Sequence, residues 1–136
     1  MTSPVKSTRA YDATRRRAAA DKTRRRVLAA AREQFLTRGY NAATVADIAA
    51  AAGVAPQTLY SSVGGKADLL RHVVNVAIAG DDVPVAIAVR PFTEAIHAEP
   101  DGTRKLALYA RRLRSGLERT AALDAVVRAA ADAEGR

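Results

Sequence analysis

The chain has 136 residues, 22 of them lysine or arginine and 14 aspartate or glutamate, so its formal net charge at pH 7 is +8. The absence of cysteine excludes disulfides and cysteine-ligated metals and favours an intracellular, cytoplasmic protein. No apolar stretch reaches the ~20 residues that a membrane-spanning helix needs, so no membrane span is expected, and the length fits one domain or one small domain with part of a second.

The positive charge is concentrated at one end of the chain. Residues 1–40 contain eleven basic and three acidic side chains, which accounts for the whole excess, whereas residues 41–136 contain eleven of each. Arginine outnumbers lysine 18 to 4, and a guanidinium pairs with phosphate bidentately where an ammonium cannot. A GC-rich genome would explain that ratio equally well, but not the asymmetry. The asymmetry predicts a basic segment that meets a polyanion, either nucleic acid or an anionic membrane surface.

Helices are the expected secondary structure throughout the chain. Hydrophobic residues make up 49% of the sequence, but 32 residues are alanine, which favours helix, whereas strands prefer branched and aromatic side chains. We therefore predict an all-α fold.

Residues 1–20 are predicted to be a flexible basic arm, because they have few large apolar side chains and no helical stripe. The arginine triplet 15–17 in this arm is followed nine residues later by a second triplet, 24–26. On one helix this spacing would place the two triplets on opposite faces. A flexible first triplet and a helical second triplet fit better.

The first helix is predicted from Asp21 to about residue 38. Its core face would carry Leu28, Ala31 and Phe35, and Gly39 stands where a left-handed cap is expected.

Two short helices are predicted next. The run Thr44–Asp47 is typical of a capping box that opens a helix, and Gly53 would end that helix. Pro56 fits the first position of the following helix, which carries Leu59 inward and stops at Gly64.

The remaining elements are predicted from apolar spacing and from interruptions by glycine and proline. One helix would cover residues 66–79 and a short one residues 91–98. A third would carry the apolar stripe of residues 106–117, with its basic residues as the solvated face opposite that stripe. A break near Thr120 would precede a last helix to about Ala133.

The second and third predicted helices, with the turn between them, match a helix-turn-helix. The outward side chains of the third helix are all hydrogen-bonding types of modest length, which suit insertion into the major groove of DNA. The alternative is a solvated polar face on an ordinary three-helix cluster, and the basic segment directly upstream favours DNA. These outward residues are Gln57, Thr58, Tyr60, Ser61 and Ser62.

A series of short motifs runs from Val27 to Leu70. They are Phe35 with Arg38-Gly39-Tyr40, then Thr44-Val45 with Ile48-Ala49, Ala52-Gly53-Val54, Thr58-Leu59-Tyr60, and finally Gly64-Gly65-Lys66-Ala67-Asp68-Leu69-Leu70. In order and spacing this series resembles the DNA-binding domain of the tetracycline-repressor (TetR) family of bacterial transcription regulators. The resemblance covers less than half of the chain.

The resemblance implies which side chains would meet the double-stranded DNA operator. Those that would hold phosphates are Thr44, Thr58, Tyr60 and Lys66. Those that would face the bases are Pro56, Gln57 and either Ser61 or Ser62. Those that would reach phosphates or the minor groove, with the arm before them, are Arg24, Arg25 and Arg26.

The resemblance also implies how the chain divides. A helix-turn-helix DNA-binding domain over 21–80 would be followed by a partial helical ligand-binding and dimerisation domain over 81–136, in which Phe92 and Tyr109 would line a small-molecule effector site. Family members usually continue through two further long helices that form the dimer interface. The resemblance thus implies a repressor shortened at its C-terminus, which forms a homodimer if the chain is complete enough.

One competing interpretation stays open, and two kinds of chemistry are not expected. The competitor is a truncated, DNA-incompetent relative that acts as a protein-interaction module. No serine, histidine and acid stand in a nucleophile motif, so neither an enzyme nor a cofactor is expected. Glu94 and His97 have the spacing of half a carboxylate-bridged metal site, but no second such pair exists, so no metal site is expected.

Overall fold

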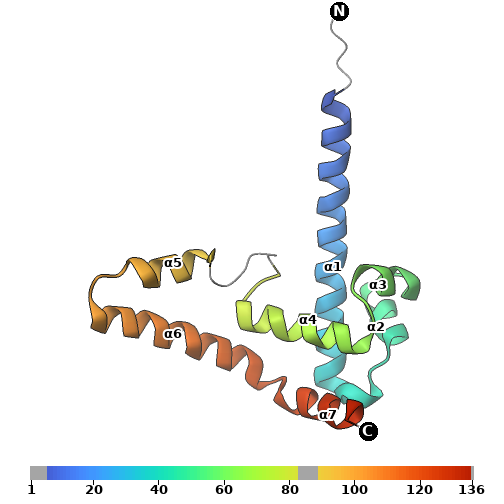
Figure 1. Cartoon of the computed structure of the whole chain (residues 1–136). Helices are drawn as coiled ribbons and strands as arrows, with labels where there is room; N and C mark the ends of the chain where they lie inside the picture. Colours follow the sequence, from blue (N-terminus) through green and yellow to red (C-terminus); the bar gives the residue numbers. More distant parts are fainter. Residues whose placement is uncertain (1–5, 83–88, 136) are drawn as a thin grey trace, which may run out of the picture.

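The computed structural model describes residues 6–82 and 89–135, and the regular secondary structure of these residues is helix alone. The all-α prediction is confirmed. No helix in the described ranges is long and apolar enough to cross a membrane. The elements in Figure 1 are α1 (Lys6–Ala42), α2 (Val45–Ala52), α3 (Pro56–Ser62), α4 (Lys66–Ala79), α5 (Pro91–Ala98), α6 (Gly102–Ala121) and α7 (Asp124–Glu134).

Helix α1 begins fifteen residues earlier than the sequence predicts. Residues 6–20 are helical and continuous with the packed part of α1, so the prediction of a flexible arm is wrong for them. Alanine and arginine are good helix formers, and extending a packed helix requires no new nucleation. Every side chain from Arg9 to Lys22 is exposed, and this part of α1 projects past the other helices in Figure 1. The two arginine triplets therefore lie on opposite faces of one helix.

The C-terminal end of α1 is interrupted where the sequence predicts its end. Gly39 has φ 79° and ψ 170°, which breaks the helical path, and a short turn continues to Ala42. The starts of α2, α3 and α4 agree with the predicted helices. The break after α6 also agrees, since α7 starts at Asp124.

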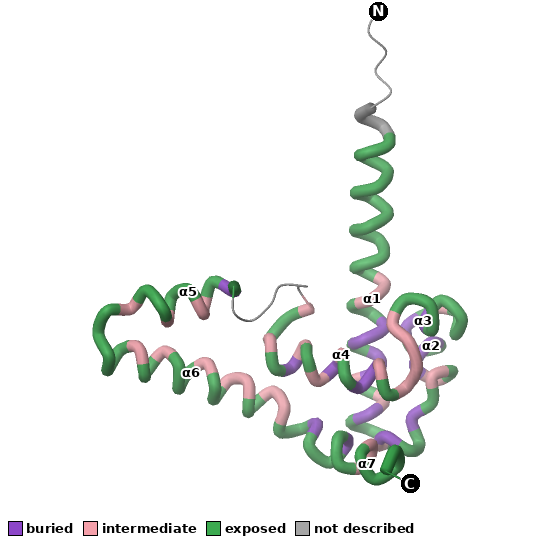
Figure 2. The backbone as a smooth tube through the Cα atoms, viewed as in Figure 1, coloured by how far each residue is buried: buried purple, intermediate pink, exposed green. Residues whose placement is uncertain are grey.

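The hydrophobic core lies where α1, α2, α3, α4 and α7 meet (Figure 2). Phe35, Ile48, Leu59 and Leu69 are fully buried there. The core also takes in Leu123 at the start of α7. Residues from beyond position 80 therefore pack into the same core as the predicted DNA-binding domain.

Helices α5 and α6 extend away from this core (Figure 1). In α6, all of whose residues are described, no side chain is buried. Its contact with α4 is made by arginines: Arg119 Nε donates to the carbonyl oxygen of Ala77 at 2.7 Å, and Arg112 donates to that of Ala79 at 2.7 Å. These carbonyls are left unpaired at the end of a helix, and arginine is well suited to them.

The interpretation of the basic residues of α6 as a solvated face is therefore wrong for two of them. Arg112 and Arg119 are half-buried and face α4, while Leu106 and Leu117 on the opposite side are exposed. The unpaired carbonyls at the end of α4 explain this inversion, because they offer acceptors that leucine cannot use.

Candidate nucleic-acid interface

The turn between α2 and α3 is closed by backbone hydrogen bonds around a left-handed glycine. Gly53 has φ 69° and ψ 34°, and its N–H donates to the carbonyl of Ala50 at 3.1 Å. The N–H of Val54 donates to the carbonyl of Ala49 at 3.0 Å. A residue with a Cβ would be strained at this φ, so glycine allows the sharp change of direction that a helix-turn-helix needs.

One side of helix α3 packs against the hydrophobic core, and the other side is exposed to solvent. Leu59 is fully buried, and Val63 packs partly against the core. The outward side chains are exposed, and Tyr60 is 56% exposed. The helix thus presents a polar surface on a rigid support, as a reader of base edges requires. The exposed set is Pro56, Gln57, Thr58, Tyr60, Ser61 and Ser62.

The two serines at the end of α3 bond to their own helix. Ser61 Oγ donates to the carbonyl of Thr58 at 3.0 Å, and Ser62 Oγ donates to that of Leu59 at 3.2 Å. Each hydroxyl proton is therefore used, and each oxygen can still accept a hydrogen bond. Gln57 and Thr58 side chains are exposed near the start of the helix.

Thr44 caps α2, as the sequence predicts. Its Oγ1 accepts a hydrogen bond from the N–H of Asp47 at 3.1 Å, so the hydroxyl proton remains available to donate. The carboxylate of Asp47 accepts from Arg38 at 2.8 Å, which ties the end of α1 to the start of α2. Thr44 itself is exposed at the helix N-terminus, where the backbone dipole favours an anion.

The ammonium group of Lys66 already makes contacts within the chain. Its Nζ donates to the carbonyl of Tyr40 at 2.9 Å and to that of Asn41 at 3.5 Å. It also lies 4.5 Å from the centroid of the Tyr40 ring, in a cation–π contact. Lys66 therefore fastens the start of α4 to the end of α1, and one of its three N–H groups is left for a phosphate.

The second arginine triplet is divided between two environments. Arg25 and Arg26 are exposed, and Arg25 Nε donates to the carbonyl of Asp21 at 3.3 Å. Arg24 instead forms an ion pair with Asp82, with 3.0 Å between Nε and Oδ2, and its side chain is 28% exposed. Only Arg25 and Arg26 of the triplet are thus directed away from the protein.

His72 completes the contact that Arg24 makes. Arg24 Nη2 lies 3.1 Å from His72 Nδ1, and because arginine can only donate, Nδ1 is the acceptor and the proton of the neutral ring is on Nε2. Burial, and then the positive charges of Arg24 and Arg71, lower the pKa of His72 below its usual 6.5, while Asp82 and Asp68 oppose the shift. A neutral histidine suits this arrangement, since a charged ring would face the guanidinium.

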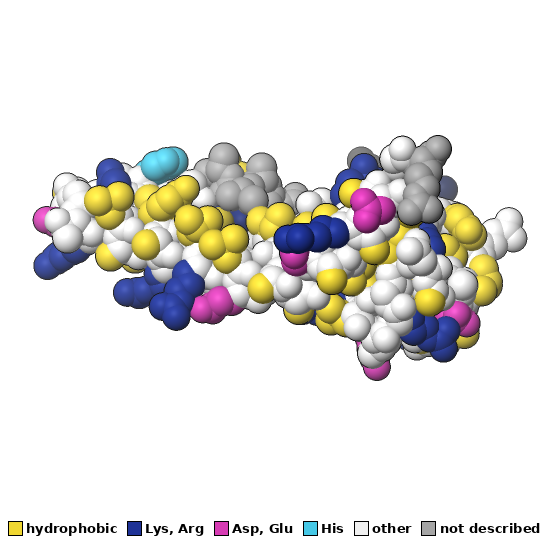
Figure 3. All heavy atoms as spheres, turned by 90° about the horizontal axis from the view of Figure 1, so that it is seen from below, with side chains coloured by type: hydrophobic (Ala, Val, Ile, Leu, Met, Phe, Trp, Pro, Cys, Tyr) yellow, Lys and Arg dark blue, Asp and Glu magenta, His cyan; other side chains and the backbone are white. Residues whose placement is uncertain are grey.

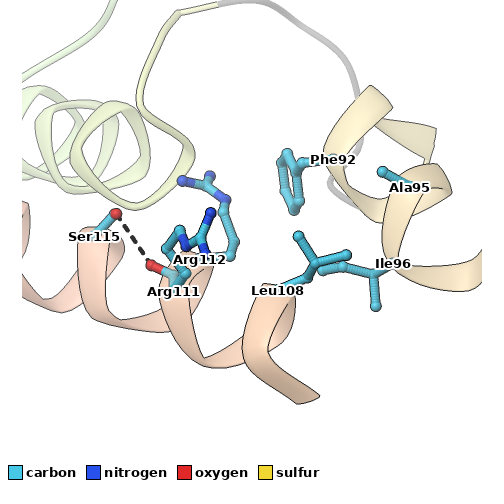
Figure 4. A pocket seen from close by; sticks show the side chains of 7 residues that line it. All are labelled: Phe92, Ala95, Ile96, Leu108, Arg111, Arg112 and Ser115. Carbon is cyan, nitrogen blue, oxygen red and sulfur yellow. Dashed lines mark hydrogen bonds between the residues drawn. The ribbon is translucent and has the colours of Figure 1, made fainter. Parts of the chain in front are cut away.

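The two residues expected at an effector site are separated. Phe92 lines a hollow of about 250 Å³ between α5 and α6, where the guanidinium carbon of Arg112 lies 4.1 Å from the ring centroid. Figure 4 shows the phenyl ring turned toward Leu108, beside the arginines of α6. Tyr109 is 56% exposed and is not among the residues around this hollow.

Sequence reasoning missed the residues that fasten α1 to the elements around it. Asp82 and His72 hold Arg24, and the hydroxyl of Tyr40 donates to Glu134 Oε1 at 3.2 Å. Burial and the neighbouring Glu134 raise the pKa of Tyr40. No short motif encodes contacts between residues 48 to 94 positions apart. The feature of the sequence that could have indicated these contacts is the acidic pair at 81–82, which lies just beyond the end of a helix.

The comparison with known proteins agrees with the geometry of this site. The model of a family described as bacterial regulatory proteins, tetR family, matches residues 27–73, which include α2, α3 and the start of α4. No curated protein and no solved structure matches the chain.

Proposed function

We propose that the chain, whose residues 27–73 match the model of the tetR family of bacterial regulatory proteins, is a DNA-binding transcription regulator that acts as a repressor and whose α3 reads the operator. The observation that carries the proposal is the exposed polar face of α3 above the fully buried Leu59. In this proposal Pro56, Gln57 and one of the serines at 61–62 face the bases.

Phosphate contacts would come from the rim of the same surface. We assign them to Thr44 at the α2 N-terminus, Thr58 and Tyr60 on α3, and the exposed Arg25 and Arg26 on α1. Lys66 would add its remaining N–H. Such contacts supply affinity without sequence preference and fix the orientation of the reading helix.

The proposed DNA-binding domain covers residues 21–80, and 81–136 is proposed as a helical regulatory domain. Repression would follow from occupancy of a promoter, and a small effector would relieve it. The hollow beside Phe92 supports an effector site between α5 and α6, because Arg112 contacts both the ring and the end of α4. An effector bound in this hollow would therefore shift the position of α4.

The experiment that tests the proposed reading helix compares specific with nonspecific binding. Duplexes are selected from a random library with the wild-type chain, and binding to the selected and to a scrambled duplex is measured at one salt concentration. The double variant Gln57→Ala, Tyr60→Ala is expected to lose ~1–3 kcal/mol of its preference for the selected duplex with the base contact of Gln57, and to bind both duplexes more weakly because the phosphate contact of Tyr60 is also lost.

The matched control is His97→Ala, an exposed position on α5. It should keep the full preference. If the double variant discriminates between the duplexes like the wild type, α3 is not the reader and the proposal fails. If the wild-type chain itself enriches no sequence, the DNA-incompetent alternative is favoured instead.

A further inference from the structure

The hollow between α5 and α6 has an apolar side and a cationic side. Phe92, Ala95, Ile96 and Leu108 form the apolar side. Arg111, Arg112 and Ser115 of α6 form the other side, and Figure 4 shows the two groups facing each other across the hollow. A molecule that fills it therefore needs an apolar body and a group that pairs with a guanidinium.

The guanidinium of Arg111 is free to pair with such a group. In the part of the chain that the structure describes, this side chain has no hydrogen-bond or ion-pair partner, although it lines the hollow. Ser115 Oγ donates its proton to the backbone carbonyl of Arg111 at 3.1 Å, so the serine offers no donor of its own. Arginine presents its N–H groups as a planar fork that matches the two oxygens of a carboxylate.

Arg112 adds a second guanidinium that is already fixed in place. Its Nη2 donates to the carbonyls of Ala79 at 2.7 Å and Ile78 at 3.1 Å, and its guanidinium carbon lies 4.1 Å from the centroid of the Phe92 ring. Its Nε and Nη1 have no partner among residues 6–82 and 89–135. Because the side chain is held by these contacts, it loses little conformational freedom when a ligand binds.

The charges around Arg112 leave an excess of positive charge. Burial, and then the positive charges of Arg119 and Arg90, lower the pKa of Arg112, while Asp81 opposes the shift. Asp81 is itself paired with Arg90 at 2.7 Å. Residues 83–88 contain no ionisable side chain in the sequence. An anion in the hollow would relieve the repulsion among these arginines.

The outer face of α6 differs from the hollow in this respect. There Arg114 Nε pairs with Glu118 Oε1 at 2.8 Å, and Figure 3 shows acidic side chains beside basic ones along this part of the molecule. No described residue that lines the hollow is acidic. The positive charge of the hollow is therefore left for a ligand to neutralise.

The size of the hollow limits the ligand. Its volume of about 250 Å³ lies below the ~300–1,000 Å³ of sites for drug-sized molecules, which corresponds to a ligand with on the order of ten non-hydrogen atoms. Inorganic phosphate would leave the apolar side unfilled, and a cation would meet two guanidinium groups. A short or single-ring carboxylic acid satisfies both sides.

We propose that this hollow binds a small organic acid, with the carboxylate on Arg111 and Arg112 and the apolar body against Phe92. The inference rests on the proposed function for its consequence, the relief of repression, and not for the binding itself. Arg112 also donates to the last carbonyls of α4. An acid bound to this guanidinium therefore acts on the same group that holds the end of α4.

The first experiment uses three probes of nearly the same shape: benzoate is negative at neutral pH, benzamide is uncharged and benzamidine is positive. Each is titrated against the full chain at constant ionic strength, and binding is followed by ligand-observed NMR. Benzoate is expected to bind with a Kd on the order of 1 mM, as suits so small a ligand. Benzamide should bind at least about tenfold more weakly, because it makes no charge-assisted hydrogen bond. Equal affinity for benzoate and benzamide overturns the proposal.

The second experiment places the probe in the hollow. Arg111→Gln should weaken benzoate binding about tenfold. Arg114→Gln removes the same charge from the same helix outside the hollow, at a side chain that is 81% exposed, and should keep the wild-type affinity. Ala95→Phe changes an exposed residue, fills the hollow and keeps both arginines, and it should abolish binding.

Circular dichroism of each variant establishes that the helices are retained. If Arg114→Gln weakens binding as much as Arg111→Gln, the effect comes from net charge and the proposal fails. It fails also if Ala95→Phe binds benzoate like the wild type.

Neither experiment contains DNA, so its failure differs from failure of the proposed function. A chain that binds benzoate in the hollow but selects no duplex sequence refutes the proposed function and leaves this inference standing. A chain that selects a duplex sequence and binds none of the probes does the reverse.

Discussion

Arg24 in α1 and Asp82, two residues beyond Gly80, form an ion pair with 3.0 Å between Nε and Oδ2 and a second contact of 3.4 Å from Nη2 to Oδ1. The same guanidinium donates to His72. Because it joins α1 to α4 and to the segment that follows α4, this arginine restrains the angle between the two helices. It therefore has a structural role that its neighbours Arg25 and Arg26 do not share.

This difference predicts unequal effects of arginine removal on DNA binding. Arg26→Ala should lower the slope of log Kd against log salt on a duplex by about 0.9, the value for one lost phosphate contact. Arg24→Ala should leave that slope nearly unchanged and lower the free energy of unfolding by about 1 kcal/mol. Fluorescence anisotropy at several salt concentrations and urea unfolding measure the two quantities. Equal loss of slope in both variants would show that Arg24 also contacts DNA.

The same cluster predicts a dependence of stability on pH. Since burial and nearby positive charge lower the pKa of His72 below 6.5, the folded chain binds fewer protons there than the unfolded chain as the pH falls through 6.5. This contribution to stability is fully present above that pH and is lost as the pH falls toward the folded-state pKa.

We therefore expect the free energy of unfolding to decrease more steeply below pH 6.5 in the wild type than in His72→Gln. Glutamine does not titrate, and its Oε1 can still accept a hydrogen bond from Arg24. Urea unfolding across this pH range measures the effect. Parallel pH profiles for the two proteins would contradict it.

The sequence predicts the DNA-binding helices well because their boundaries are encoded locally. Thr44, Gly53 and Pro56 fix the ends of α2 and α3 through a cap, a left-handed turn and a proline at the first helical position. The buried side chains follow helical spacing, so the spacing alone predicts that Leu28 and Phe35 lie in the core, where the structure places them.

Two features could not be predicted from local pattern. Residues 6–20 carry no apolar stripe, yet they are helical because α1 is nucleated by its packed part. Apolar spacing predicts that the leucines of α6 face inward, but Arg112 and Arg119 do so instead, because an arginine beside unpaired helix carbonyls is as well satisfied as one in water. At the candidate DNA interface, the residue types predict which side chains would contact DNA, but the different environments of Arg24 and Arg25 depend on Asp82, 58 positions away from Arg24.

The geometry of the loop before α4 predicts that one added methyl group at Gly64 strongly lowers the stability of the fold. Gly64 has φ 114°, and a Cβ there would lie 2.5 Å from Oδ2 of Asp68, the oxygen that accepts the N–H of Gly65. Gly64→Ala should therefore lower the free energy of unfolding by at least about 1–2 kcal/mol, through backbone strain and displacement of the cap. Gly102→Ala is the matched control, since a Cβ there meets nothing within 4 Å. Thermal unfolding compares them, and equal stability of the two variants would contradict the prediction.

Substitutions of Thr44 can separate its role as the N-cap of α2 from its proposed role in holding a phosphate. Thr44→Ala should lower the free energy of unfolding by about 1 kcal/mol, because the N–H of Asp47 loses its acceptor. Thr44→Asp should restore that stability, since aspartate is a good N-cap, yet it should weaken DNA binding further because its charge repels a phosphate. Thr44→Ser keeps both the cap and the hydroxyl donor and should resemble the wild type in both measurements. Urea unfolding and anisotropy on one duplex supply the two readouts. If Thr44→Asp binds DNA as tightly as Thr44→Ser, then no phosphate lies at the start of α2, and its threonine serves the fold alone.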